Sequence, residues 1–223
     1  MAVVDGSDTV TSDGAVWVIV VAAGSGARFG GAKQYEPLAG RRVLDWSLDA
    51  ARSCADGVVL VVGDGAPVDE PADRVVTGGA TRAQSVRAGL EAVPDDAAIV
   101  LVHDAARPLA SPALFEATVA AVRAGADAVV PGVTPVDTMR SVDGGVIDRD
   151  LLVAVQTPQG FGASVLRAAH AGHGDATDDA GLVEAIGGSV TVIEGEPANR
   201  KITTPEDLLI AEALLDRARE VQQ

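Results

Sequence analysis

The sequence contains little cysteine and few aromatic residues, and it has no long apolar run. Its single cysteine, Cys54, cannot form an internal disulfide, which favours a reducing compartment. Only 3% of the residues are aromatic, so a core must be built mainly from Ala, Val, Leu and Ile. The early apolar run 15–23 is far shorter than the roughly 20 residues that a membrane-spanning helix needs. We therefore expect a cytoplasmic protein with no membrane partner.

Positive charge is also scarce. The chain has 17 Lys and Arg residues against 32 Asp and Glu, a net charge of −15. Binding to nucleic acid or to an anionic membrane needs a basic surface, so this balance argues against both. A small phosphorylated ligand needs only a few local cations and stays possible. The only two lysines, Lys33 and Lys201, stand out in a chain that otherwise uses arginine.

What the sequence does contain is an alternation of strand-like and helix-like segments. With 223 residues, 48% of them hydrophobic, it can form one domain, which we place at 15–223 after a polar, flexible tail at 1–14. Helical spacing separates the β-branched runs, which predicts an α/β fold: a mostly parallel twisted sheet with helices on both faces. The predicted strands are Val16–Val21, Val58–Val62, Ala98–Val102, Ala128–Val130 and Val190–Ile193.

Two segments differ from this alternation. Between Pro131 and Pro158 the helical spacing disappears, and the pair Gly144-Gly145 predicts a hairpin-like excursion that protrudes from the sheet. Such an excursion has too little apolar surface to pack on itself, so we expect it to pack on a second subunit. Near the end, Thr204-Pro205 predicts the start of a final helix.

Ligands of parallel sheets bind where loops leave the carboxyl ends of the strands. After the first strand, the turn Gly24-Ser25-Gly26 would present backbone N–H groups to an anion, and Arg28 and Lys33 follow it. The spacing fits neither a dinucleotide-binding fingerprint, because Phe29 occupies the third glycine position, nor a Walker loop. A purely structural turn is the alternative interpretation.

Two further motifs follow predicted strands. Asp104, with Arg107 three residues later, is placed to hold Mg²⁺ or a substrate hydroxyl, although capping a turn is the alternative role. Gly78-Gly79, followed by Ser85, allows close contact with a flat base, or else simply begins a capped helix. His170 and His173 lie in a Gly/Ala-rich stretch far from the only cysteine, so no zinc site is predicted, and His103 is interpreted as structural.

These motifs together resemble the 2-C-methyl-D-erythritol 4-phosphate cytidylyltransferases of the non-mevalonate isoprenoid pathway. The similarity runs in order from about residue 16 to 212. It implies a Rossmann-like nucleotidyltransferase fold and a reaction of CTP with methylerythritol phosphate that needs Mg²⁺. It also implies a homodimer, with an arm at about 134–151 whose Arg149 reaches the partner's site. The motifs are Ala22-Ala23-Gly24-x-Gly26-x-Arg28, Lys33-Gln34-Tyr35, Gly78-Gly79…Arg82-x-x-Ser85, His103-Asp104-Ala105-Ala106-Arg107-Pro108, Asp137-Thr138, Thr157-Pro158-Gln159, Thr177-Asp178 and Asn199-x-Lys201-Ile202-Thr203.

The resemblance also implies a role for each matched residue. Arg28, Lys33 and Lys201 would neutralise the reacting α-phosphate. Asp104 would take part in substrate binding and could hold Mg²⁺, which the triphosphate would otherwise hold alone. The residues expected around CTP are Ala22, Ala23, Gly24, Ser25, Gly26, Gly79 and Ser85, and those expected around methylerythritol phosphate are Asp104, Arg107, Thr138, Arg149, Thr157 and Thr177.

Other functions fit many of the same motifs. A cytidylyltransferase acting on ribitol 5-phosphate shares most of them, and a guanylyltransferase of related fold shares fewer. A non-catalytic nucleotide-binding protein would not need Arg28, Lys33, Asp104 and Lys201 together. The sequence also departs from the family pattern: Val21 stands where proline is frequent, Ala80 replaces a frequent acidic residue, and Arg200 stands where an aliphatic residue is common.

Overall fold

The computed structural model describes residues 14–67, 69–172 and 177–221. Residues 1–13 of the predicted tail lie outside this range. The chain folds around a mixed sheet in the order β10-β7-β11-β6-β1-β4-β5, with β12 also paired to β7. The strands are β1 (Val16–Ala22), β4 (Gly57–Val62), β5 (Arg74–Thr77), β6 (Ile99–Asp104), β7 (Ala128–Val133), β10 (Ala154–Val155), β11 (Gln159–Gly162) and β12 (Val190–Glu194).

Most of the sheet is parallel, as predicted. β1 pairs in parallel with β4 and β6, β4 pairs with β5, and β12 pairs with β7. The exception near the centre is β11, which runs antiparallel between β6 and β7. This strand was not predicted from the sequence, because its four residues Gln159–Gly162 include two glycines and form no apolar run.

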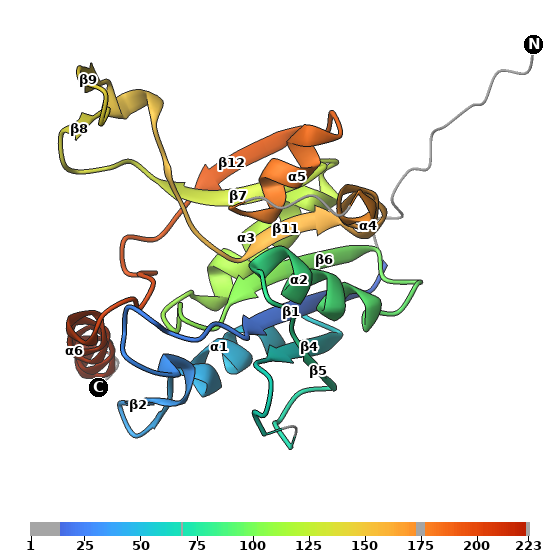
Figure 1. The fold of residues 1–223 in the computed structure, drawn as a ribbon, viewed down its shortest axis with the longest axis horizontal. Helices are drawn as coiled ribbons and strands as arrows, with labels where there is room; N and C mark the ends of the chain where they lie inside the picture. Colours follow the sequence, from blue (N-terminus) through green and yellow to red (C-terminus); the bar gives the residue numbers. More distant parts are fainter. Residues whose placement is uncertain (1–13, 68, 173–176, 222–223) are drawn as a thin grey trace, which may run out of the picture.

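Helices cover both faces of the sheet (Figure 1). Alternate residues of β1 supply the two cores: Val18 and Val20 pack with the helices of one face, and Ile19 packs with those of the other. This alternation is why the β1 run is apolar throughout. The first face carries α1 (Val43–Arg52) and α3 (Pro112–Arg123), and the second carries α2 (Arg82–Glu91), α4 (Ala163–Ala171) and α5 (Asp179–Ala185).

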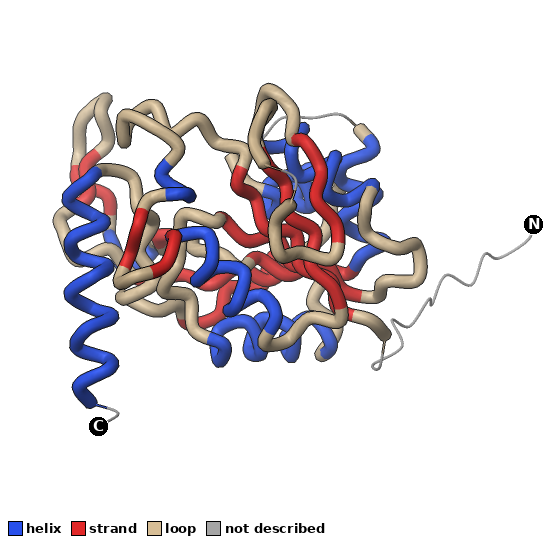
Figure 2. Tube along the Cα trace, turned by 90° about the horizontal axis from the view of Figure 1, so that it is seen from below, coloured by secondary structure: helices blue, strands red, loops and turns tan. Residues whose placement is uncertain are grey.

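The final helix, α6 (Pro205–Val221), lies beside the body on the side toward which the parallel strands point (Figures 1 and 2). It begins with the predicted proline, and the Asp207 carboxylate accepts hydrogen bonds from the backbone N–H groups of Thr203 and Thr204. Ala211 packs in a small cluster with Leu38 and Ile202. This packing brings the segment before α6, which carries Lys201, against the loop after β1. Among the described residues, no helix is long and apolar enough to cross a membrane.

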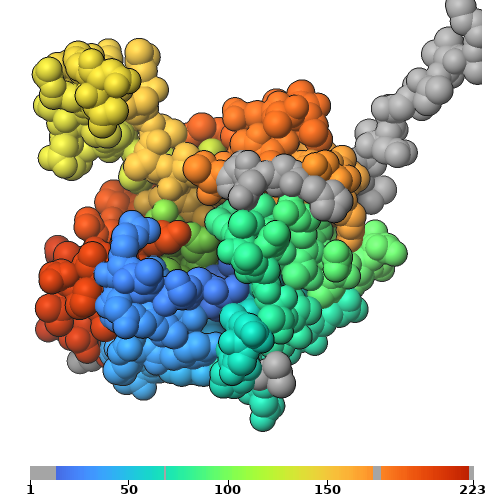
Figure 3. All heavy atoms as spheres, viewed as in Figure 1, coloured from blue at the N-terminus to red at the C-terminus, as the bar shows by residue number. Residues whose placement is uncertain are grey.

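The predicted excursion is an arm that stands clear of the body (Figure 3). It contains a hairpin of β8 (Met139–Arg140) and β9 (Val146–Ile147), followed by the short 3₁₀ helix η2 (Arg149–Leu151). Gly144 and Gly145 form the turn, with φ values of 107° and 82° that favour glycine. Eight large apolar side chains of the segment 136–155 are exposed: Val136, Met139, Val142, Val146, Ile147, Leu151, Val153 and Val155.

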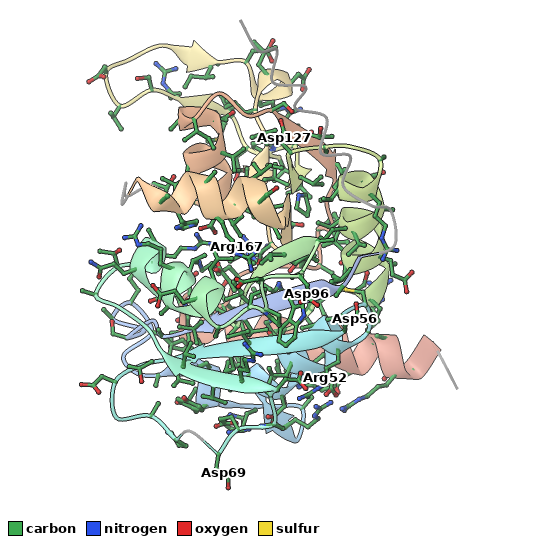
Figure 4. All side chains as sticks on the ribbon, turned by 90° about the vertical axis from the view of Figure 1, so that its right-hand side faces the viewer. Arg52, Asp56, Asp69, Asp96, Asp127 and Arg167 are labelled. Carbon is green, nitrogen blue, oxygen red and sulfur yellow. The ribbon has the colours of Figure 1, made fainter. Side chains whose placement is uncertain are left out.

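At the opposite end of the molecule, charged side chains support the strands (Figure 4). Asp56 accepts a hydrogen bond of 2.8 Å from the backbone N–H of Val16 at the start of β1. Asp127 accepts from the backbone and the side chain of Ser189. Arg167 donates to the carbonyl oxygen of Pro94 at 2.9 Å. These charged groups are therefore committed to structural hydrogen bonds.

Candidate functional site

A cavity of about 510 Å³ opens at the carboxyl ends of β1 and β6. Segments that are far apart in the sequence meet there: the loop after β1, the start of α2, the end of β6 and the segment before α6. Most of the predicted site residues lie in its wall. The predicted residues that line it are Ala22, Ala23, Gly24, Ser25, Gly26, Arg28, Lys33, Gly79, Ser85, Asp104 and Lys201.

The glycine turn after β1 has a fixed shape. Gly26 adopts a φ of +65°, and its carbonyl oxygen accepts hydrogen bonds from the N–H groups of Phe29, Gly30 and Gly31. A side chain at Gly26 would collide with the Gly31 carbonyl. Both this lack of space and the positive φ therefore require glycine there. Gly24 differs, because a Cβ atom at that position would meet no protein atom within 4 Å. The space beside Gly24 is therefore free for a ligand.

Gln34 holds the loop in place and was not among the predicted site residues. Its buried side chain donates a hydrogen bond of 2.8 Å to the carbonyl oxygen of Ala22. This contact ties the short 3₁₀ helix η1 (Lys33–Tyr35) to the end of β1 and places Lys33 in the wall of the cavity. The sequence signals for Gln34 are its place in the motif Lys33-Gln34-Tyr35 and its position next to one of the two lysines.

Four cationic side chains line the cavity: Arg28, Lys33, Arg82 and Lys201. Burial and the charges of Lys201 and Arg28 lower the pKa of Lys33, although Asp104 and Asp207 act in the opposite direction. Lys33 therefore lies close enough to Lys201 and Arg28 for their positive charges to disfavour its own. Both of the chain's lysines thus face one cavity, where an anion would relieve the repulsion between them.

Asp104 is the acidic group of the cavity. One carboxylate oxygen lies 2.6 Å from the Nζ of Lys201, and the other lies 3.6 Å from the Nε of Arg82. Burial acts to raise the pKa of Asp104, but Lys201, Arg82 and Arg107 outweigh it and hold the pKa well below its usual range. Asp104 is therefore a stable carboxylate, able to accept a hydrogen bond from a substrate hydroxyl.

Buried groups behind Asp104 fix its backbone. The Thr157 hydroxyl accepts a hydrogen bond of 3.0 Å from the Asp104 N–H and lies 3.1 Å from the Nδ1 of His103. Burial lowers the pKa of His103 to about 4, so the ring is neutral near pH 7. Thr157, a predicted substrate ligand, is thus buried with its hydroxyl engaged by the protein.

The second glycine motif is the capped start of α2 and also lines the cavity. Thr81 accepts a hydrogen bond of 3.2 Å from the Gln84 N–H, so the motif is a capped helix start. The Ser85 hydroxyl accepts from the Gly79 N–H at 3.2 Å and donates to the Thr81 carbonyl at 3.0 Å. Ser85 thereby shapes the turn, and Gly79 still lines the cavity.

The remaining predicted substrate ligands lie elsewhere. Arg107 donates to the carbonyl oxygens of Asn199 at 2.7 Å and Val155 at 3.1 Å, in a second cavity of about 240 Å³ that shares Lys201 with the first. Arg149 lies on the arm and donates to the Val136 carbonyl at 2.6 Å. Within this chain, the predicted ligands that do not line the first cavity are Arg107, Thr138, Arg149, Thr157 and Thr177.

The chain is similar to members of one family in sequence and in fold. The family described as 2-C-methyl-D-erythritol 4-phosphate cytidylyltransferase matches residues 16–217. A protein of that name from Nocardia farcinica is 47% identical over 92% of this chain and 96% of its own length. One from Frankia casuarinae is 48% identical over 91% of this chain and 82% of its length. The crystal structure of the Thermus thermophilus enzyme of the same name superposes with a TM-score of 0.80, at 39% identity, covering 90% of this chain and 98% of that one.

Proposed function

The chain belongs to the 2-C-methyl-D-erythritol 4-phosphate cytidylyltransferase family, and we propose that the larger cavity is where it carries out that family's reaction. The protein transfers CMP from CTP to 2-C-methyl-D-erythritol 4-phosphate, giving 4-diphosphocytidyl-2-C-methyl-D-erythritol and pyrophosphate. The observation that carries this assignment is the meeting of Arg28, Lys33 and Lys201 beside the glycine turn of one cavity. A triphosphate supplies the negative charge that these three cations need.

The nucleotide occupies the part of the cavity next to β1. The backbone at Gly24, Ser25 and Gly26 wraps the triphosphate, because N–H groups of such a turn bind phosphate oxygens. Ala22, Ala23 and the Gly79 turn surround cytosine and ribose, with Ser85 holding that turn in shape. Hydrogen bonds to the edge of the base would select cytosine, since a base that leaves buried groups unpaired is rejected.

The chemistry is an in-line phosphoryl substitution. An oxygen of the acceptor phosphate forms a bond to the α-phosphorus of CTP, and the bond from that phosphorus to the bridging oxygen breaks as pyrophosphate leaves. No general base is needed, because a phosphate monoester is largely a dianion near neutral pH. Arg28, Lys33 and Lys201 neutralise the negative charge on the α-phosphate, so positioning and electrostatics supply the rate enhancement.

The acceptor lies on the Asp104 side. The Asp104 carboxylate accepts a hydrogen bond from a hydroxyl of the alcohol, and Lys201, which borders both cavities, faces the phosphates of both substrates. Arg107 orients the end of the arm against the Lys201 segment through its two carbonyl contacts. Thr157 supports Asp104 from behind, and Thr177 lies before α5, exposed to solvent.

A homodimer completes the acceptor site. The exposed apolar side chains of the arm need a partner surface, and a second copy of the chain is the partner that the family resemblance implies. Arg149 donates to the carbonyl oxygen of Val136 on the same arm, so within its own chain it binds a neutral group and lies away from both cavities. We place Arg149 and Thr138 at the partner's acceptor site.

The protein's own residues do not fit a resident Mg²⁺ ion. Among the described residues, no group of three or more His, Cys, Asp or Glu side chains could hold a metal. The carboxylate of Asp104 is occupied by two cations, whereas Mg²⁺ prefers several oxygen ligands free of competing positive charge. We propose that Mg²⁺ accompanies CTP as part of the substrate and is held by the triphosphate, while Asp104 binds the acceptor alcohol.

A matrix of substrates tests this function. Pyrophosphate release is measured for four nucleoside triphosphates against methylerythritol 4-phosphate, ribitol 5-phosphate and a sugar phosphate. We expect turnover with CTP and methylerythritol phosphate to exceed every other pair. Preferential use of ribitol phosphate would assign the sister activity, use of GTP would assign a guanylyltransferase, and nucleotide binding without release of pyrophosphate would identify a non-catalytic protein.

Adding one methyl group at Gly24 tests where the triphosphate lies. We expect Gly24→Ala to leave the melting temperature unchanged and to raise KM for CTP on the order of 10-fold, because the Cβ atom occupies ligand space and not protein space. Gly31→Ala is the matched control: its Cβ atom also meets no protein atom, and Gly31 does not line the cavity. Equal KM values for CTP in both variants would move the triphosphate away from Gly24.

A further inference from the structure

A row of alternating charges leads from the cavity into the core on the α2 side. It begins at Lys201 and continues through Asp104 to Arg82, the first residue of α2. The Nη1 of Arg82 lies 2.6 Å from the carboxylate of Asp179, whose other oxygen lies 3.0 Å from the Nε2 of His170. The row thus connects β6, α2, α5 and α4.

Arg82 is the fixed member of this row. Asp179 is fully buried, and an unpaired charge at such a place is strongly destabilising, so Asp179 holds the guanidinium of Arg82 in place. Burial acts to lower the pKa of Arg82, but Asp179 and Asp104 together raise it, so the guanidinium stays charged. The hydrogen bond from the Gly181 N–H to Asp178 anchors the same end of α5.

Lys201 is the more exposed cation of the row. Its side chain is 40% exposed, against 24% for Arg82, and its ammonium group is paired with the carboxylate of Asp104. Lys201 cannot hold Asp104 and neutralise a phosphate equally well. When its ammonium group turns to the phosphate, Asp104 loses its closest cation while its side chain is only 13% exposed. A second cation is then needed to keep that carboxylate ionised and in place.

We propose that Arg82 is a positioning residue that acts as the standing counter-ion of Asp104, so that Lys201 is free to move from Asp104 to the reacting phosphate. This inference rests on the proposed function and deepens it. The carboxylate of Asp104 is shared between Lys201, which moves, and Arg82, which does not. The buried Asp179–His170 pair holds the guanidinium of Arg82 and prevents it from moving toward the phosphate. Arg82 also lines the cavity, but its guanidinium is directed to Asp179 and Asp104, so we assign it to Asp104 and not to a reacting atom.

A double-mutant cycle on kcat tests the proposal. Without the charge of Arg82, Lys201 is the remaining close counter-ion of Asp104, and this ion pair competes with the reacting phosphate for the ammonium group. Arg82→Gln therefore lowers kcat on the order of 10-fold or more. Lys201→Ala lowers kcat on the order of 10²-fold in the wild-type background, but by less than about 3-fold when added to Arg82→Gln, because Lys201 is already withheld from the phosphate. Arg82→Lys, which keeps a cation, recovers most of the lost turnover.

The controls separate this role from a structural one. Arg167→Gln removes an arginine of the same face that bonds to carbonyl oxygens of Val93 and Pro94, and we expect unchanged kcat. Arg82→Gln leaves the buried Asp179 without its cation, so a lowered melting temperature is expected whichever role Arg82 has. If Arg82 only stabilised the fold, the Lys201→Ala factor would be the same in both backgrounds. That result would overturn the proposal, as would wild-type turnover in Arg82→Gln. A wild-type protein without CMP transfer would instead reject the proposed function.

Discussion

Replacing Lys33 or Lys201 with alanine is expected to lower kcat on the order of 10²-fold or more, because each ammonium group stabilises the negative charge on the α-phosphate most strongly in the transition state. Both side chains are partly exposed and support no core packing, so the variants are expected to fold normally. Steady-state pyrophosphate release at saturating substrates measures the effect, and thermal unfolding verifies the fold.

Arg52→Ala is the control for these variants. Arg52 is an exposed cation at the opposite end of the sheet (Figure 4), where its side chain donates to the Pro71 carbonyl. It changes the net charge of the protein by the same amount without touching the cavity. We expect kcat to stay at the wild-type value. Near-wild-type turnover in either lysine variant would reject the role assigned to that lysine.

Removing the arm's arginine is expected to affect the acceptor and not the nucleotide. Arg149→Ala raises KM for methylerythritol phosphate on the order of 10-fold or more, as expected for the loss of a charge-assisted contact to a phosphate. Binding of CTP is unchanged, because the cavity of Arg28, Lys33 and Lys201 does not include Arg149. Separate titrations of the two substrates measure the split. A raised KM for CTP alone would contradict the assignment.

Mixed dimers decide which subunit Arg149 serves. Chains carrying Arg149→Ala are combined with chains carrying Lys33→Ala, neither of which is active alone at low acceptor concentration. If the arm crosses to the partner, each mixed dimer has one site with both defects and one intact site. Random assortment makes half of the dimers mixed, so about a quarter of the wild-type activity returns. Recovery to no more than the sum of the parent activities would place Arg149 at its own chain's site.

The arrangement of the strands near the cavity could be inferred from the sequence because each signal was local. The β-branched run Val16–Val21 predicted the central strand, and Gly24 to Gly26 after it predicted the turn. Once parallel strands are expected, the ends of β1 and β6 must share one edge, which brings Asp104 near that turn. The rarity of lysine then singled out Lys33 and Lys201, which the structure places in the same cavity.

What the sequence could not show are contacts between distant residues. Asp104 and Thr157 are 53 residues apart, and Arg82 and Asp179 are 97 residues apart, so no periodicity reveals that they meet. The antiparallel strand β11 is what brings Thr157 behind Asp104, and its glycines gave no strand signal. For the same reason, the bond of Gln34 to the end of β1 was visible only in the folded chain.

A crystal structure of the protein with CTP tests the central claim most directly. We predict that the triphosphate lies against Gly24–Gly26, that oxygens of its phosphates accept hydrogen bonds from the Nζ atoms of both Lys33 and Lys201, and that Arg82 still faces Asp104. A nucleotide bound elsewhere, or bound in this cavity with either lysine turned away from its phosphates, would contradict the account.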